Sequence, residues 1–250
     1  STDDRWTLTN GPAAGMSGSP IIIDDRLAGA LSFSVGDTVT PFLFVATPIE
    51  KMLAVDAAPL ETATADSTPL SAVLGVPSGA AEWLTGTGVF DDRFITIPDG
   101  ALGVTGSGSG DAPSLVPGSA IAVLFITGDI LNTGGIGTVT AVDDDRVWAF
   151  GHPMTQAGPT TFPFSAAEIM AVAANPIFGA YKIASPAGPI LGAITDDHIA
   201  AIAGRFGALP TMVATHVEAT YDGETETADN HTARVNDRFG TAQFATFSVV

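Results

Sequence analysis

The sequence contains no cysteine, and this absence excludes several kinds of chemistry. Without thiols the chain forms no disulfide bonds, offers no thiolate ligands to a metal and has no cysteine nucleophile. The absence says little about the cellular compartment, because many secreted bacterial proteins also lack cysteine. Any nucleophilic catalysis must therefore come from another type of residue.

Basic residues are also scarce. Nine lysines and arginines face 27 acidic residues, and Lys51 and Lys182 are the two lysines. The net charge of −18 argues against nucleic acid or anionic lipid as a partner, because both require a cationic surface. Two explanations of this charge remain open: solubility in a salty or extracellular setting, and attraction to basic substrates.

Long apolar runs are missing as well. No stretch approaches 18 consecutive apolar residues, so we expect no membrane span. The polar start Ser1–Arg5 lacks the basic-then-apolar order of a signal peptide, so we expect a cytosolic protein or one whose signal has been removed. Hydrophobic residues make up 46% of the chain and charged residues 14%, which argues against disorder over most of its length.

Glycine and proline, by contrast, are abundant, with 28 and 17 copies that separate short apolar runs. This pattern favours strands over helices and predicts an all-β fold with a few short helices. A chain of 250 residues fits one β-barrel-type domain or two smaller ones. Hairpin turns are expected at Asp24-Asp25 and at Asp143–Asp145. The expected strands are 21–23, 27–33, 42–46, 121–126, 137–142 and 147–150.

Two segments are predicted to be helical. Pro48–Val55 follows Thr47, a residue type that caps helices, and has proline at the first helical position. Ser165–Ala174 begins with a serine and has Glu168 three residues later, which is the pattern of a capping box.

The segment 56–117 differs in composition from its surroundings. It is rich in alanine, threonine, serine, proline and glycine, and it contains the flexible run Gly106–Gly110. Trp83, Phe90 and the run Phe94–Ile97 indicate that it also carries some structure. We therefore interpret it as a long connection between an N-terminal block (1–55) and a C-terminal block (118–250) of a single domain.

A glycine-flanked serine is the first candidate for chemistry. In Gly15-Met16-Ser17-Gly18-Ser19-Pro20, the two glycines allow the backbone to turn sharply beside the Ser17 hydroxyl. Such a turn suits a nucleophile whose neighbouring N–H groups converge on a substrate carbonyl. Ser19 is a competing nucleophile, but no glycine follows it. Taken alone, this short pattern is weak, because glycine and serine are common in turns.

A histidine at the end of a predicted strand is the second candidate. His152 lies between Gly151 and Pro153, directly after the strand 147–150, where a fixed backbone suits a general base. A single histidine is more often a surface or packing residue, and that interpretation is kept for the other three histidines. These are His198, His216 and His231.

Together the two motifs resemble the SpoIVB (S55) family of bacterial serine peptidases. Residues 15–20, the strand that follows them and the helix ending in Ile49–Leu53 resemble the serine-bearing end of that domain. Residues 137–140 and Ala149–Pro153 resemble its histidine-bearing beginning. The resemblance covers roughly residues 2–55 and 118–220. Further matches are Lys182, Gly192–Ile194 and Ile202–Gly207.

The order of the two motifs departs from the sporulation peptidase, in which the histidine block comes first. Here Ser17 precedes His152, which indicates a circular permutation or a relative of the larger family members. A catalytic triad is defined by geometry and not by chain order, so activity is compatible with this order. Activity does require the two blocks to pack together across 56–117.

The resemblance implies a chymotrypsin-like fold of two small β-barrels and a serine endopeptidase that acts through an acyl-enzyme. Self-processing is a further implication, as is an extracellular or cell-envelope location in a bacterium. Ser17 would be the nucleophile and His152 the general base. The backbone N–H groups of Gly15 and Ser17 would form the oxyanion hole.

The carboxylate that would orient His152 has two candidates. Asp3, with Asp4 as its neighbour, lies in an acidic stretch that resembles one shortly before the serine motif of the family. Asp197 follows His152 on a loop after the strand Gly192–Ile194, as the acid does in many two-barrel proteases. A Ser–His dyad without a carboxylate is the third possibility.

Other chemistries have less support in the sequence. The histidines lack the H-x-x-x-H spacing of a metal site, and Gly134–Gly137 lacks the lysine of a phosphate-binding loop, so we expect no metal and no cofactor. The expected partner is a protein or peptide substrate. The alternative function is a catalytically silent barrel that serves as an extracellular binding or assembly module. An α/β-hydrolase esterase is disfavoured, because the G-x-S-x-G pattern is absent around Ser17.

Overall fold

The computed structural model of the chain describes residues 11–34, 44–55, 68–69, 72–76, 94–98, 114–128, 132–173, 180–208, 210 and 212–233. Strands dominate these residues, which confirms the predicted all-β class. None of the helices in this part of the chain is long and apolar enough to cross a lipid bilayer.

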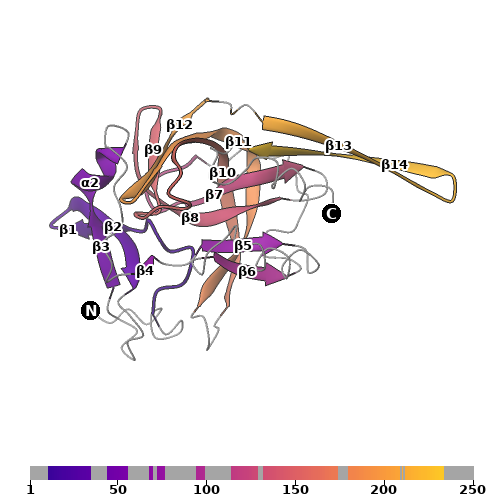
Figure 1. The fold of residues 1–250 in the computed structure, drawn as a ribbon. Helices are drawn as coiled ribbons and strands as arrows, with labels where there is room; N and C mark the ends of the chain where they lie inside the picture. The colour runs from indigo at the N-terminus through magenta and orange to yellow at the C-terminus, as the bar shows by residue number, and fades with distance from the viewer. Residues whose placement is uncertain are drawn as a thin grey trace.

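Six antiparallel strands of the C-terminal block close into a ring (Figure 1). The strands follow one another in the order β10-β11-β12-β9-β8-β7, and β7 pairs back with β10. Closure satisfies the edges of a sheet, so this part of the molecule is a small β-barrel. The ring consists of β7 (Ala120–Gly128), β8 (Thr133–Asp143), β9 (Arg146–Ala149), β10 (Gly158–Ala173), β11 (Tyr181–His198) and β12 (Ala201–Phe206).

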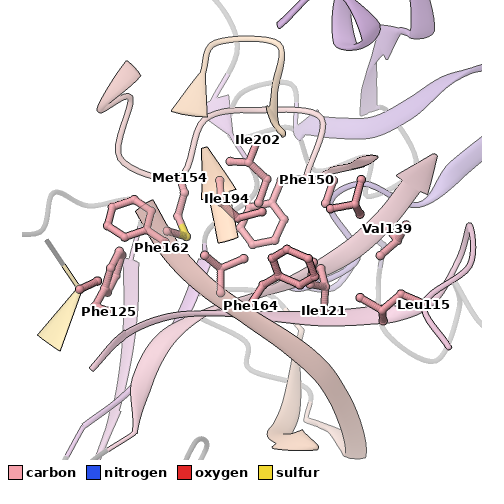
Figure 2. Close-up of a cluster of buried hydrophobic side chains, with 14 of the residues drawn as sticks. Leu115, Ile121, Phe125, Val139, Phe150, Met154, Phe162, Phe164, Ile194 and Ile202 are labelled. Atoms are coloured by element: carbon pink, nitrogen blue, oxygen red, sulfur yellow. The ribbon is translucent and has the colours of Figure 1, made fainter. Parts of the chain in front are cut away.

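Alternate residues of the barrel strands form the main hydrophobic core. Ile121, Val123 and Phe125 of β7 are buried in one cluster, to which all six strands of the ring contribute. Because successive side chains of a strand point to opposite faces, this alternation assigns the cluster to a single face of the sheet. Figure 2 shows the same cluster with Phe150 and Met154, which belong to the segment after β9.

The N-terminal block forms a second, smaller sheet. It is four-stranded, with β1, β2 and β3 in that order and β4 paired with β2. In the described part of this block, a short helix follows β3 directly. Within the described residues this sheet is open, so the closed ring accounts for one of the two barrels expected from the resemblance. The elements are β1 (Pro20–Ile23), β2 (Arg26–Ser34), β3 (Phe44–Pro48), β4 (Thr68–Pro69) and α2 (Ile49–Leu53).

The two blocks share a buried contact. Ala30 and Met52 from the N-terminal block pack with Trp148 and Ala203 from the barrel in one hydrophobic cluster. Ala14 also forms a parallel bridge with Tyr181 at the start of β11. Segments from the two ends of the chain are thereby fixed against each other.

Two further pairs of strands complete the described structure. β5 and β6 are parallel and belong to the predicted connection, in which the run Phe94–Ile97 does form a strand. β13 and β14 form a long hairpin that joins the sheet through β7 and projects beyond the barrel in Figure 1. Their bounds are β5 (Ala72–Val76), β6 (Phe94–Pro98), β13 (Met212–Tyr221) and β14 (Glu224–Ala233).

The predicted turns and one predicted helix are confirmed. Asp24 and Asp25 both have positive φ, as the type I′ turn of a two-residue hairpin requires, and Asp144 lies in the turn between β8 and β9. The helix after Thr47 runs over Ile49–Leu53. Its N-cap is Pro48, and the Thr47 hydroxyl binds elsewhere.

The second predicted helix, Ser165–Ala174, is wrong. The segment belongs to β10, which pairs with β11 from Gly158 to Ala173 and with β7 at residues 164–166. β11 pairs with the segment along most of its length and β7 pairs with its start, and this tertiary pairing overrides the local capping-box pattern. Ser165 donates its hydroxyl hydrogen bond to the Ala166 carbonyl and not to a helix N-terminus.

Candidate active site

The turn that carries Ser17 is held against strand β8 of the barrel. The Ser17 carbonyl accepts a hydrogen bond of 2.8 Å from the Thr138 N–H. The Thr138 hydroxyl donates to the Gly15 carbonyl at 3.0 Å, and the Thr140 hydroxyl donates to the Gly18 carbonyl at 2.7 Å. Three carbonyls of the serine turn are thus fixed by one strand of the other block.

Gly18 marks the closest approach of the serine turn to the histidine segment. Its φ is +91°, and a β-carbon there would lie 2.0 Å from the Thr138 carbonyl oxygen and 2.5 Å from the Phe150 nitrogen. Only glycine fits this position, because both the conformation and the space exclude a side chain. The glycine after Ser17 therefore lets the serine turn pack on the backbone that leads to His152.

Two N–H groups of the turn that carries Ser17 donate no hydrogen bond to another described residue. The N–H groups of Met16, Gly18 and Ser19 donate to backbone carbonyls. Among the hydrogen bonds of the described residues, neither the Gly15 nor the Ser17 N–H group is a donor. These are the two N–H groups that the family resemblance implies for an oxyanion hole, and both are able to donate to a ligand.

Ser19, the competing nucleophile, has a different environment. Its hydroxyl donates a 2.6 Å hydrogen bond to the Met16 carbonyl, which also accepts from the Ser19 N–H at 2.9 Å. Because a trans peptide group directs its C=O and N–H to opposite sides, Ser19 thereby orients the N–H of Ser17 away from itself.

A strained turn presents His152. Phe150 has a φ of +69°, a conformation that a non-glycine residue rarely adopts, and Gly151 follows with the same value. The Phe150 ring is buried over Gly137, where a β-carbon would lie 2.0 Å from the ring. The Thr47 hydroxyl donates to the Gly151 carbonyl at 2.5 Å, so the N-terminal block holds this turn as well.

The hydrogen bond of His152 defines its tautomer. Nδ1 lies 2.7 Å from the carbonyl oxygen of Pro153. A carbonyl can only accept, so Nδ1 carries the proton and the neutral ring has its lone pair on Nε2. This is the tautomer that a general base of a serine protease needs. The rings of Phe33 and Phe150 pack against the imidazole at centroid distances of 6.1 and 5.8 Å.

Asp197 lies within β11 and not on the predicted loop, because the pairing of β11 with β12 continues through it; it is fully buried, and its hydrogen bonds are to the loop that follows His152. Oδ1 accepts from the Met154 N–H at 2.8 Å. Oδ2 accepts from the N–H and hydroxyl of Thr155, each at 2.7 Å, and from the Ala157 N–H at 3.4 Å. Burial raises the pKa of Asp197, and these hydrogen bonds oppose that rise. Since the three N–H groups can only donate, the carboxylate acts as an acceptor on both oxygens.

The structure brings the turns of Ser17 and His152 together and buries both side chains. Ser17 is 1% exposed and His152 is 2% exposed. Among the described residues no hydrogen bond joins the Ser17 hydroxyl to His152. In ligand-free enzymes catalytic hydrogen bonds are often long or poorly aligned, and they shorten when a substrate binds.

The remaining candidates lie elsewhere. Asp3 and Asp4 fall outside the described residues. His198 is buried at the end of β11, 3.8 Å from Asp196. His216 and His231 are exposed on the β13–β14 hairpin, where His216 pairs with Asp229 at 2.6 Å.

Sequence reasoning missed the residues that support the two turns. Thr138 and Thr140 are buried polar residues two apart on a strand that is otherwise mostly apolar or glycine, and that pattern is a usable signal for a polar contact. Lys182 matches the family pattern, but no local pattern predicts its position beneath the turn that carries Ser17. Its Nζ lies 2.8 Å from the Gly15 carbonyl oxygen.

Comparison of the chain with known proteins, and a search of its described residues for metal ligands, assign no function to the site. No family model, no curated protein and no solved structure matches this chain. In the described part of the chain, no three histidine or acidic side chains are grouped as ligands for a metal ion.

Proposed function

We propose that this protein is a serine endopeptidase of SpoIVB-like type, with Ser17 as nucleophile and His152 as general base. The observation that carries the proposal is the convergence of two turns distant in sequence. Thr138 accepts from the Phe150 N–H at 3.3 Å through its carbonyl and donates to the Ser17 carbonyl through its N–H. One residue of β8 thus links the serine turn to the histidine turn.

The proposed reaction uses the groups that these turns present. Nε2 of His152 would take the proton of the Ser17 hydroxyl as the oxygen attacks the peptide carbonyl, and would then give it to the leaving amine. The N–H groups of Gly15 and Ser17 would bind the oxyanion, and one such donor is typically worth about 3 kcal/mol in the transition state. Water would then release the acyl group from Ser17 by the same steps.

Asp197 supports this assignment in an indirect way. The Pro153 carbonyl and the Met154 N–H belong to one peptide group, which accepts from His152 on one side and donates to Asp197 on the other. A carboxylate bound to the N–H polarises the peptide and makes its carbonyl a better acceptor. We therefore expect Asp197 to orient His152 through this peptide. Direct contact by Asp3 stays a prediction.

The burial of Ser17 and His152 favours a second candidate, the silent binding or assembly module. With 1% and 2% exposure, these side chains require a rearrangement before a peptide bond can reach them. In the module, the buried serine and histidine turns would serve only to join the two blocks.

Hydrolysis of a mixed peptide library separates the two candidates. The wild-type protein and Ser19→Ala should generate new peptide ends that mass spectrometry detects, whereas Ser17→Ala and His152→Ala should generate none. The Ser19 variant keeps the rest of the turn and serves as the matched control. Equal cleavage by Ser17→Ala would remove the nucleophile assignment. No cleavage by the wild type under any condition would favour the module.

A further inference from the structure

Lys182 is a half-buried lysine, and among the described residues no acidic side chain is its partner. Burial lowers its pKa to about 8, and no charged group in the described part of the chain contributes to that shift. The chain has 27 acidic residues, yet the described partners of Nζ are the Gly15 carbonyl at 2.8 Å and the Thr138 hydroxyl at 3.3 Å. Burying an ammonium group is costly, so this placement calls for a role other than stability.

The backbone and the side chain of Lys182 hold two consecutive peptide groups of the serine turn. Its N–H donates to the Ala14 carbonyl at 2.9 Å, and its ammonium group donates to the Gly15 carbonyl. Its side-chain carbons also pack beneath Gly15, where a β-carbon would lie 3.1 Å from Cδ. The peptide groups on both sides of the Gly15 α-carbon are therefore fixed by one residue.

The backbone hydrogen bond from Lys182 determines where the Gly15 N–H points, and the side chain fixes the peptide that follows. In a trans peptide the N–H and the C=O point in opposite directions, and the described residues contain no cis peptide. Because β11 binds the Ala14 carbonyl, the Gly15 N–H is directed away from β11. The Gly15–Met16 peptide cannot flip without breaking the hydrogen bond between its carbonyl and the Lys182 ammonium group.

We propose that Lys182 is a positioning residue: its ammonium group holds the Gly15 carbonyl, which lies between the Gly15 and Ser17 N–H groups proposed for the oxyanion, and it brings a positive charge to this turn. The inference rests on the proposed serine-peptidase function. A fixed donor and a nearby cation both stabilise negative charge that develops on a carbonyl oxygen. Gly15, Thr138 and the strand partner Val172, which face Lys182 from the serine turn, β8 and β10, carry no titratable group.

The rate at which a fluorophosphonate probe labels Ser17 tests this role without a known substrate, because the phosphoryl oxygen occupies the oxyanion hole. Lys182→Met should lower the rate constant by roughly 100-fold, the cost of a small misplacement in an active site. Lys182→Arg should recover part of it. Lys51→Met removes the chain's other lysine, which is exposed on α2, and should label like the wild type.

The pH profile adds a readout that a purely structural lysine would not affect. Labelling of the wild type should fall as the pH rises through about 8, and Lys182→Met should lack this fall. Hydrogen exchange at the Met16 N–H, measured in the same proteins, should be faster in Lys182→Met. Unchanged labelling with unchanged exchange would overturn the inference.

The exchange measurement keeps the two proposals apart. Suppose that Met16 exchanges faster in Lys182→Met and that the wild type is neither labelled nor able to hydrolyse peptides. This result would support the claim that Lys182 fixes the turn and would reject the peptidase function. Rapid labelling of Ser17 in both wild type and variant would support the peptidase and overturn the role of Lys182.

Discussion

At the scale of single residues, the candidate site is built from backbone groups held by a few polar side chains. Thr138, Thr140 and Ser19 each bind a carbonyl of the serine turn, while Thr47 binds one in the histidine turn. A buried hydroxyl that reaches a backbone carbonyl is typically worth about 1 kcal/mol, and its loss leaves an unsatisfied group. The side chains around Ser17 thus fix its geometry more than they supply chemistry.

Substitution of Asp197 and substitution of Asp3 should lower catalysis to different extents, depending on which carboxylate orients His152. If Asp197 acts through the Pro153–Met154 peptide, Asp197→Asn should lower kcat/KM by roughly 10- to 100-fold, as loss of an outer partner of a functional histidine typically does. If Asp3 contacts His152 directly, Asp3→Asn should cost roughly 10⁴-fold. Thr155→Val is the control, because it removes one donor to Asp197 and leaves the Met154 bond in place. Normal kinetics in both aspartate variants would indicate a dyad.

The lowered pKa of Lys182 also leads to a prediction of how the stability of the protein depends on pH. The folded state lowers its pKa from 10.5 to about 8, so between these values the unfolded chain binds more protons than the folded one. The free energy of unfolding should therefore rise with pH across this window, by up to about 3 kcal/mol, and the contribution should be absent below pH 8. In urea denaturation, the stability of the wild type relative to Lys182→Met should grow from pH 7.5 to pH 10.5. A constant difference would contradict the burial of the ammonium group.

At the scale of elements, much of the fold follows from local sequence patterns. The short apolar runs between glycines and prolines form strands, as predicted, and Asp24-Asp25 forms a turn with positive φ at both residues. The helix predicted for Ser165–Ala174 is wrong, because the pairing of β10 with β11 and β7 depends on segments distant in sequence. The candidate residues Ser17 and His152 could be named from their motifs. The threonines and the lysine that hold them could not, because their contacts span the two blocks.

Gly18 provides a test of how closely the serine turn packs on β8. Gly18→Ala places a β-carbon 2.0 Å from the Thr138 carbonyl oxygen at a positive φ, so we expect a loss of more than about 2 kcal/mol in unfolding free energy. Gly223→Ala is the matched control. Gly223 has a φ of +81° with nothing within 4 Å of an added β-carbon, so it should cost only about 1 kcal/mol. Equal losses in the two variants would mean that the turn is not packed as described.

At the scale of the whole molecule, the two blocks depend on each other. Met52 and Ala30 complete a cluster with Trp148, and the serine turn forms hydrogen bonds with β8 and β11. Burying a side chain such as Met52 contributes roughly 1.5–3 kcal/mol. Neither block presents the candidate site without the other.

Cleavage of the chain in the connection tests this dependence. A protease site inserted after residue 100 and cut in the folded protein should leave both pieces associated in size-exclusion chromatography, because the contacts between blocks do not rely on that bond. The cut protein should keep its labelling of Ser17. Separation into two independently folded pieces would contradict the shared cluster. The uncut protein with the same insertion is the control.

The central claim is that Ser17 is an activated nucleophile, and a fluorophosphonate probe addresses it most directly. The purified protein is incubated with the probe and digested, and the modified residue is identified by mass spectrometry. We predict a single modification on Ser17 that is absent from His152→Ala, since that variant lacks the base. Modification of Ser19, or no modification of the folded wild-type protein, would contradict the claim.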